Sequence, residues 1–383
     1  MLRRRLLFLS LLWSLIVALP ASCAKQAPAT VTPSATPPAV APAPAPAPAA
    51  TRDATHPAIP DRLSDAEFWK LVTEFSEPNG FFRSDNLLSN EVWMQYVIPE
   101  LLEIAKPGRV YMGVGPEQNF TYITAVKPAM AFIVDVRRGN LNLQLMYKAL
   151  FELSTDRADF VSRLFSRPRP DGLTSRSTVA DIFSAYWPTQ PSDELFAANF
   201  DAIVSLLSKT HAFTLSADDI ENIRSVYAQF ETAGPALTYS MGGRGGRNFP
   251  TYADLMVATD EGGTSRSYLA TEENFAFIKS LESRNLLVPV VGNFAGPKAV
   301  RSVGAYVRAR NGIIQTFYLS NVEQYLTMDG IWLDFCRNVA TLPMDETSRF
   351  IRSVRNTQFG FPGGLTNQLG AMVEEVKANS CGM

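Results

Sequence analysis

Two short, uninterrupted apolar runs constrain the fold of this chain most strongly. They span residues 109–115 and 130–137, and the second contains the sequence Ala-Phe-Ile-Val-Asp. Continuous apolar runs of this length are typical of strands that are buried on both faces. Each run is followed by apolar residues at helical spacing, over 119–126 and 140–154. This alternation of strand and helix predicts a parallel sheet with helices packed on it.

The same alternation returns in the last third of the chain. It predicts helices at 272–284, 297–310 and 329–339 and strands at 286–291 and 313–319. Residues 155–250 lack such strand-like runs, and we expect them to form an inserted helical cap. A helix that opens at the capping box Ser64–Glu67, and a second helix at about 90–105, precede the first strand. We therefore expect residues 61–383 to form one α/β domain, a three-layer Rossmann-like sheet with an inserted helical subdomain at about 155–250.

The N-terminal segment has the pattern of an export signal. Three arginines precede an apolar stretch of about 14 residues, Leu6–Leu19, which is too short to span a bilayer comfortably. Leu19–Cys23 resembles a bacterial lipobox, so we expect a lipoprotein signal peptide at 1–23 with Cys23 lipidated. Ordinary cleavage after Ala24 remains an alternative. We expect an exported protein, anchored by lipid in the periplasm, in the outer membrane rather than the inner.

An Ala/Pro-rich segment follows the signal. Residues 27–50 contain eight prolines and ten alanines, a composition that favours extended polyproline II over helix or sheet. We expect residues 24–60 to be a disordered linker. Its role would be to hold the folded domain away from the membrane. We expect the protein to contact the membrane only through the lipid anchor.

The net charge and the small number of histidines and cysteines argue against two classes of function, nucleic acid binding and metal binding. Of 35 basic and 37 acidic residues, five basic and one acidic lie in the first 60, which leaves 30 and 36 and a net charge of −6 for the domain. Such a domain has no general attraction for phosphate backbones, so we expect no nucleic acid partner. With only His56 and His211, and with no metal-type cysteine spacing, we expect no metal site. Cys336 and Cys381 could pair in an oxidising compartment or stay free.

The first strand–helix turn carries the main ligand-binding pattern. Gly113 and Gly115 permit a sharp turn and a close approach of a ligand to the backbone, with Glu117 next to them. Asp135 follows 20 residues after Gly115, at the end of the second strand, where a carboxylate can accept hydrogen bonds from ribose. Alternatively, the glycines only shape the turn and Asp135 caps the next helix. Arg137 is either a solvated side chain or a contact for an anion.

Polar side chains also follow two later strands. Asn293 ends the strand at 286–291, and Asn321 and Glu323 follow the strand at 313–319. Because α/β sheets bind ligands beyond the carboxyl ends of their strands, these three are our candidate catalytic residues. Only Glu323 among them could accept a proton.

Four segments carry a family resemblance: 113–120, 132–145, 290–298 and 317–325. They resemble an uncharacterised bacterial family whose core is similar to class I S-adenosylmethionine-dependent methyltransferases, and the resemblance covers about residues 62–360. It implies that Gly113 and Gly115 line the methionine moiety and that Asp135 holds the ribose. Tyr111 stands where such enzymes usually have an acid, and Glu117 where they often have a third glycine.

Two functions follow as expectations. The first is a methyltransferase-like protein that binds S-adenosylmethionine or another adenosine-type ligand. The second is a non-catalytic lipoprotein that keeps the Rossmann-like frame and binds an unknown small molecule or interacts with a partner. Export favours the second, because S-adenosylmethionine is made in the cytoplasm, whereas the motif positions favour the first. Fold alone does not decide between them.

Overall fold

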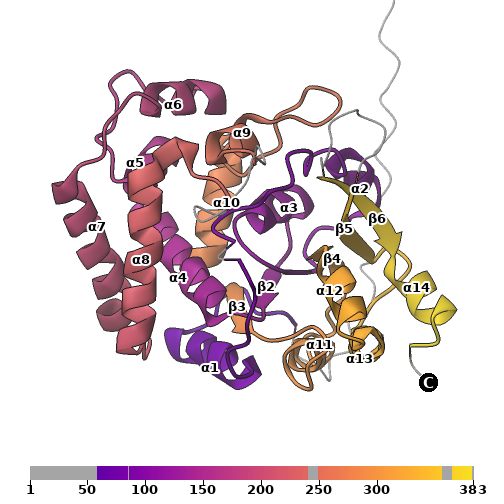
Figure 1. Cartoon of the computed structure of the whole chain (residues 1–383). Coiled ribbons are helices and arrows are strands. Elements are labelled where there is room, and N and C mark those ends of the chain that lie inside the picture. Colours follow the sequence, from indigo (N-terminus) through magenta and orange to yellow (C-terminus); the bar gives the residue numbers. More distant parts are fainter. Residues whose placement is uncertain (1–57, 85, 240–248, 356–364, 382–383) are drawn as a thin grey trace, which may run out of the picture. The chain divides into compact units, whose positions relative to one another are not determined.

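The computed structural model describes residues 58–84, 86–239, 249–355 and 365–381 (Figure 1). The predicted signal peptide with Cys23, and all but the end of the predicted linker, lie outside these residues. Among the described residues, none of the helices has the length and apolar character needed to span a membrane.

A six-stranded sheet forms the centre of the described domain. Its strands lie in the order β3-β2-β1-β4-β5-β6, and all neighbours are parallel except the antiparallel pair β5 and β6. This is the standard strand order of doubly wound α/β folds, with an antiparallel last strand. The predicted α/β class with a mostly parallel sheet is confirmed. The strands are β1 (Val110–Gly113), β2 (Met130–Asp135), β3 (Leu287–Val291), β4 (Ile314–Ser320), β5 (Arg349–Arg355) and β6 (Leu365–Ala371).

The four predicted strands are confirmed, and their burial explains their sequences. Every residue of β1, β2 and β3 is buried, as is all of β4 except its last residue. Helices therefore cover both faces, and the sequence shows no polar alternation. Pro289 lies within β3, which is tolerated because β3 is an edge strand and needs no hydrogen bond from that position.

The direction of the strand connections places the helices. Right-handed crossovers from β1 to β2 and on to β3 put α3 and α4 on one face. The return from β3 to β4 and on to β5 runs the opposite way, so α11 and α13 cover the other face, where α1 packs against α11. The helices of these layers are α1 (Asp65–Phe75), α3 (Gln118–Val126), α4 (Arg138–Leu153), α10 (Glu272–Ser283), α11 (Ala299–Arg308) and α13 (Trp332–Ala340).

Two helix starts show how local sequence sets an element boundary. The Ser64 hydroxyl accepts a hydrogen bond from the Glu67 backbone, and the Glu67 carboxylate accepts one from Ser64, so the predicted capping box is confirmed. The helix predicted at about 90–105 is shorter than expected, because α2 spans only Ile98–Ile104. Pro99 lies in its first turn, the place in a helix where a missing backbone N–H costs least.

The described part of the predicted insertion is helical. Figure 1 shows α5 to α8 grouped beside α4, on the side away from β4, β5 and β6. The elements from here on are α5 (Arg157–Phe165), α6 (Val179–Tyr186), α7 (Asp193–Ser205), the π-helical turn Leu206–Thr210, α8 (Ala217–Ala233), the short turn Gly234–Ala236 and α9 (Tyr252–Val257). In chain order, α12 (Val322–Met328) follows β4 and α14 (Met372–Ala378) follows β6.

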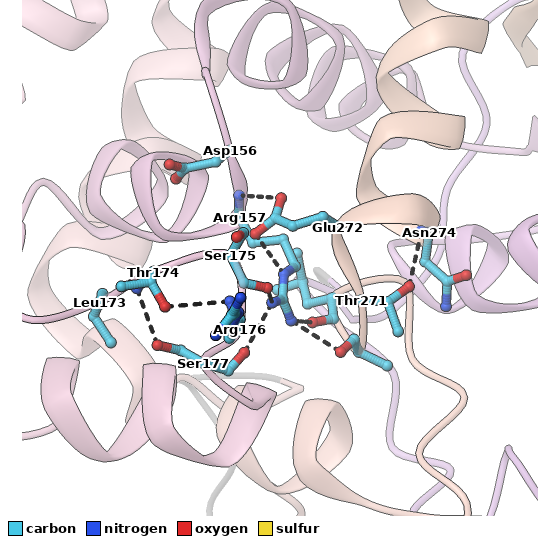
Figure 2. A network of polar contacts seen from close by, with 12 residues as sticks. Asp156, Arg157, Leu173, Thr174, Ser175, Arg176, Ser177, Thr271, Glu272 and Asn274 are labelled. Carbon is cyan, nitrogen blue, oxygen red and sulfur yellow. Dashed lines mark hydrogen bonds and ion pairs between the residues drawn. The ribbon is translucent and has the colours of Figure 1, made fainter.

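One buried arginine fastens this helical region to the α/β core. The guanidinium of Arg157, at the start of α5, donates to the Glu272 carboxylate (2.8 Å) and to the carbonyls of Leu269 (2.8 Å) and Ala270 (2.9 Å). It also reaches the Ser175 and Ser177 carbonyls, so three chain segments meet at one side chain (Figure 2).

The two remaining cysteines are joined. Cys336 in α13 forms a disulfide with Cys381 beyond α14. Of the two alternatives, paired or free, the structure has the paired cysteines.

Candidate functional site

An irregular segment, residues 76–84 and 86–91, crosses the carboxyl edge of the sheet, and we call it the strap. Along the strap, successive hydrogen bonds reach the ends of β3, β2, β1 and β4, which is their order in the sheet. The Glu77 N–H donates to Val291 at the end of β3 (2.8 Å), and the Gly80 N–H donates to Val136 just after β2 (2.8 Å). Further along, Ser89 donates to Glu117 after β1 (3.2 Å), and Glu91 accepts from Ser320 at the end of β4 (2.7 Å). The strap therefore covers the edge at which doubly wound folds bind their ligands.

The two glycines of the first turn have different surroundings. A Cβ atom on Gly113 would collide with the Asn119 side chain and the Tyr111 ring, whose polar ends are hydrogen-bonded to each other at 2.9 Å. Asn119 also donates to the Val114 carbonyl (2.9 Å) and closes the turn. Gly115 has a φ of +79°, and no atom lies within 4 Å of its Cβ position. Gly113 therefore serves the packing of the turn, whereas space remains open at Gly115.

Asp135 and Arg137 form an ion pair at the end of β2. The Asp135 carboxylate is buried and accepts from the backbone N–H of Arg137 (2.9 Å) and from its guanidinium (3.2 Å). Arg137 also donates to the Ser84 carbonyl of the strap (3.1 Å). The carboxylate expected to hold ribose thus has partners within the protein, and Arg137 is held between the strand end and the strap.

Glu117 lies beneath the strap in an apolar, tyrosine-rich part of the core. Burial raises the pKa of Glu117 to about 8, and the charge of Glu91 adds to the rise. One carboxyl oxygen accepts from the Ser89 N–H, and the other has no hydrogen-bond partner among the described residues. At neutral pH Glu117 is therefore mostly protonated and able to donate a hydrogen bond.

The candidate catalytic residues do not lie together. Asn293 follows β3, and its side chain accepts from the Ala295 N–H (2.9 Å). Asn321 stands at the N-cap position of α12 after β4 but its side chain makes no capping hydrogen bond, and Glu323 in the same helix pairs with Arg352 of β5. Two strands separate β3 from β4, a distance of about 14 Å at ordinary strand spacing. Asn293 and Glu323 therefore cannot act on one reacting atom in this arrangement.

The sequence interpretation missed Glu91, a buried carboxylate at the point where the strand order reverses. Its Oε1 accepts from the hydroxyls of Tyr318 (2.9 Å) and Ser320 (2.7 Å). Its Oε2 accepts from the amides of Gln118 (2.6 Å) and Asn367 (2.8 Å). The four donors come from β4, α3 and β6, so no local pattern in the sequence could have revealed the cluster.

A cavity of about 340 Å³ opens beside the carboxyl end of β2. Three walls enclose it: the strap, the start of α4, and α8 of the helical region. The α8 wall is held to α4 by the ion pair of Arg138 with Asp219 (2.9 Å) and by the hydrogen bond of Asn142 to Asn222 (3.1 Å). The lining residues are Asn79, Gly80, Phe81, Phe82 and Leu87, then Arg137, Gly139 and Leu143, and Asn222, Ser225, Val226 and Gln229.

Residues 87–378 match a protein family described as a domain of unknown function, DUF7790. The chain belongs to this family. The region that matches DUF7790 begins inside the strap and ends in α14, so it contains the whole sheet, the helical region and all five members of the Glu91 cluster. A comparison with curated proteins gave no match.

The site expected for S-adenosylmethionine differs from what the structure has. S-adenosylmethionine would have to contact Gly113 and Asp135. The space beside Gly113 is occupied by the side chains of Asn119 and Tyr111, and the Asp135 carboxylate is paired with Arg137. The residues present do not fit that arrangement, although Gly115 is open. Within the described ranges, no three His, Cys, Asp or Glu side chains gather as a metal site would require.

Proposed function

We propose that this domain is a non-catalytic binding protein for a small molecule of the adenosine type. The observation that carries the proposal is the cavity between the strap, α4 and α8. Its volume of about 340 Å³ is within the range of small-molecule sites, and it lies at the carboxyl end of a parallel strand.

The cavity wall supports a heterocyclic ligand. Leu87, Leu143 and Val226 offer apolar surface to the faces of a ring system. The amides of Asn79, Asn222 and Gln229 offer donors and acceptors to its edges. A nucleoside combines these two requirements in one molecule.

The same wall argues against catalysis at this place. Among its described residues, none is an Asp, Glu, His, Lys or Cys, so the wall offers no general base or strong nucleophile. Glu323, our only candidate base, lies elsewhere and its carboxylate is paired with Arg352. Binding without chemistry is therefore the function that these residues support best.

A methyltransferase remains a second candidate on two observations. The sheet has the doubly wound strand order, and Gly115 leaves space beside the first strand–helix turn. Such an enzyme would bind S-adenosylmethionine and S-adenosylhomocysteine much more tightly than adenosine, which contains no amino acid moiety.

We also propose that the protein acts outside the cytoplasm, as a lipoprotein anchored through Cys23 in the periplasm. The Cys336–Cys381 disulfide supports an oxidising compartment, where such bonds persist. The apolar segment and the Ala/Pro-rich stretch that precede the domain support export and tethering.

Calorimetric titration of the full-length protein tests the binding proposal. We expect adenosine to bind, and we expect Ser225→Trp to weaken binding at least about tenfold, roughly 1.4 kcal/mol, because the indole would fill the cavity from the exposed face of α8. Thr232→Trp is the matched control, since Thr232 is also exposed on α8 but does not line the cavity.

The outcomes separate the candidates. Absence of binding by any adenosine compound at millimolar concentration would contradict the proposal. A strong preference for S-adenosylmethionine over adenosine would favour the methyltransferase instead.

A further inference from the structure

The Glu91 cluster has the composition of a carboxylate receptor. Each oxygen of one carboxylate accepts two hydrogen bonds, and all four donors are uncharged. The Glu91 side chain is 1% exposed, and Gln118, Tyr318 and Asn367 are buried with it. Four convergent donors suit a group that only accepts hydrogen bonds, which is what an ionised carboxylate does. The Gln118 Oε1 atom, 2.9 Å from the Tyr318 hydroxyl, is a second acceptor for that one donor.

The Gln118 amide is oriented by contacts other than the one with Glu91. The Gln118 Oε1 atom accepts from the Ser89 hydroxyl and lies 2.9 Å from the Tyr318 hydroxyl, so the amide cannot turn over without losing these contacts. Its Nε2 therefore faces Glu91 and also donates to Tyr122 (2.9 Å). An amide in place of the Glu91 carboxylate has one oxygen instead of two, so it could not accept from all four donors at once.

The receptor and its occupant belong to different parts of the molecule. The donors lie on α3, β4 and β6, at the reversal point of strand order where doubly wound sheets bind ligands. The carboxylate comes from the strap, which has no helix or strand over its described residues 76–84 and 86–91. The strap is joined to the sheet edge by separate hydrogen bonds rather than by a ladder.

We propose that Gln118, Tyr318, Ser320 and Asn367 form a binding site for the carboxylate of a ligand, and that Glu91 occupies this site from within the chain. A ligand carboxylate enters when the strap lifts and Glu91 leaves. The ligand is a small organic acid or the C-terminal carboxylate of a peptide, which share this chemistry. This site is separate from the cavity beside β2 and does not depend on it.

Thermal unfolding of full-length Glu91→Ala tests the proposal. Removing the carboxylate takes one acceptor away from each of the four donors, and added acetate should fill the gap. We expect the variant to melt below the parent protein and to regain several degrees with saturating acetate. Acetamide at the same concentration, and chloride at the same ionic strength, should give no such recovery.

Two further variants make the result specific. In Glu91→Ala combined with Tyr318→Phe, one donor is lost and the recovery with acetate should fall. Glu103→Ala is the control, because Glu103 is an exposed carboxylate on α2 and its removal leaves no buried donor without an acceptor. That variant should not respond to acetate.

Hydrogen exchange of the parent protein provides a second measurement that needs no variant. A ligand that displaces Glu91 should speed exchange at residues 86–91 and leave β1 and β2 unchanged. Acetate, succinate and a dipeptide with a free or an amidated C-terminus distinguish the two ligand sources. A site for peptides should respond more strongly to the dipeptide with a free C-terminus than to either acid, and it should not respond to the amidated dipeptide. If carboxylates change neither the melting of Glu91→Ala nor the exchange of residues 86–91, the proposal is wrong. If Glu91→Ala does not fold with or without acetate, the exchange result alone decides.

Discussion

Arg157 illustrates how one side chain can carry a large share of the contact between two parts of the molecule. Its side chain is 2% exposed and pairs with Glu272. Four backbone carbonyls accept its other hydrogen bonds, and these come from the loop after α5 and from the segment before α10. Buried carbonyls have no water to replace a lost donor, so removing the guanidinium would leave several of them unpaired.

We therefore expect Arg157→Gln to lower the free energy of unfolding by about 3–5 kcal/mol, as when one partner of a buried pair is removed. Arg163→Gln is the matched control on the same helix. Arg163 forms an i,i+4 pair with Asp159 and is 29% exposed, so its loss should cost less than about 1 kcal/mol. Urea unfolding of both variants checks the difference, and equal losses would show that the network contributes little.

At this scale the sequence indicated positions but not partners. The spacing of Gly113, Gly115 and Asp135 placed all three correctly at the ends of β1 and β2. It could not show that Asn119 fills the space beside Gly113, or that Arg137 pairs with Asp135. These contacts depend on side-chain orientations and on the strap, which are not encoded in a local spacing.

Among the elements, predictability followed burial. Strands β1 to β4 are mostly apolar because both faces are covered, and the sequence predicted each of them. The polar exceptions are Asp135 at the end of β2 and Gln315, Thr316 and Ser320 in β4. Strands β5 and β6 were missed because polar residues interrupt them. Arg352 in β5 is paired with Glu323 and Glu375, which satisfies its charge inside the fold. Such a strand is recognised only when its partners are known.

The disulfide links the last two helices of the chain. Cys336 and Cys381 close a loop with a sequence separation of 45 that begins inside α13 and contains β5, β6 and α14. A cross-link over a loop of this length stabilises the folded state by about 4 kcal/mol in the chain-entropy description.

Replacing both cysteines by serine should therefore lower stability by about 2–4 kcal/mol. A reductant should lower the melting temperature of the parent protein and leave the double variant unaffected. Differential scanning calorimetry with and without dithiothreitol measures both effects. A reductant that acts equally on both proteins would contradict the assignment.

On the scale of the whole molecule, the sheet edge collects residues that are far apart in the chain. Glu91, Gln118, Tyr318 and Asn367 come together only because the strand order brings α3, β4 and β6 to one place and the strap crosses them. The sequence alone predicts the fold class, which depends on local patterns of apolar and polar residues. It does not predict this cluster, which depends on the full topology.

Three buried groups couple the stability of the domain to pH in the same direction. Burial raises the pKa of Glu117 and of Glu282 from 4.5 to about 8. Burial alone would lower the pKa of His211, but hydrogen bonds to Glu152 (2.9 Å) and Asp65 (2.7 Å) outweigh it and raise the pKa above 6.5. Each group thus holds its proton more tightly in the folded than in the unfolded protein.

We therefore expect the domain to lose stability as the pH rises. Between pH 4.5 and about 8 the unfolded state binds fewer protons at the two glutamates, and His211 adds to this from pH 6.5 upward. On the acid side, hydrogen bonds to Arg138 and Arg109 outweigh burial and hold the pKa values of Asp219 and Asp345 well below 3.8, so their contribution is lost only below about pH 4. Stability should be greatest near about pH 5.

Urea unfolding of the parent protein and of Glu117→Gln, measured from pH 4 to pH 9, tests this expectation. The glutamine keeps the shape of a protonated glutamate but cannot ionise, so the fall in stability between pH 5 and 8 should become shallower by up to about 1.4 kcal/mol per pH unit. Glu103→Gln is the control, because Glu103 is exposed and its replacement should leave the slope unchanged. A parent protein whose stability stays flat or rises from pH 5 to pH 8 would mean that Glu117 and Glu282 reach water in the folded state, since burial is the main cause of their raised pKa values.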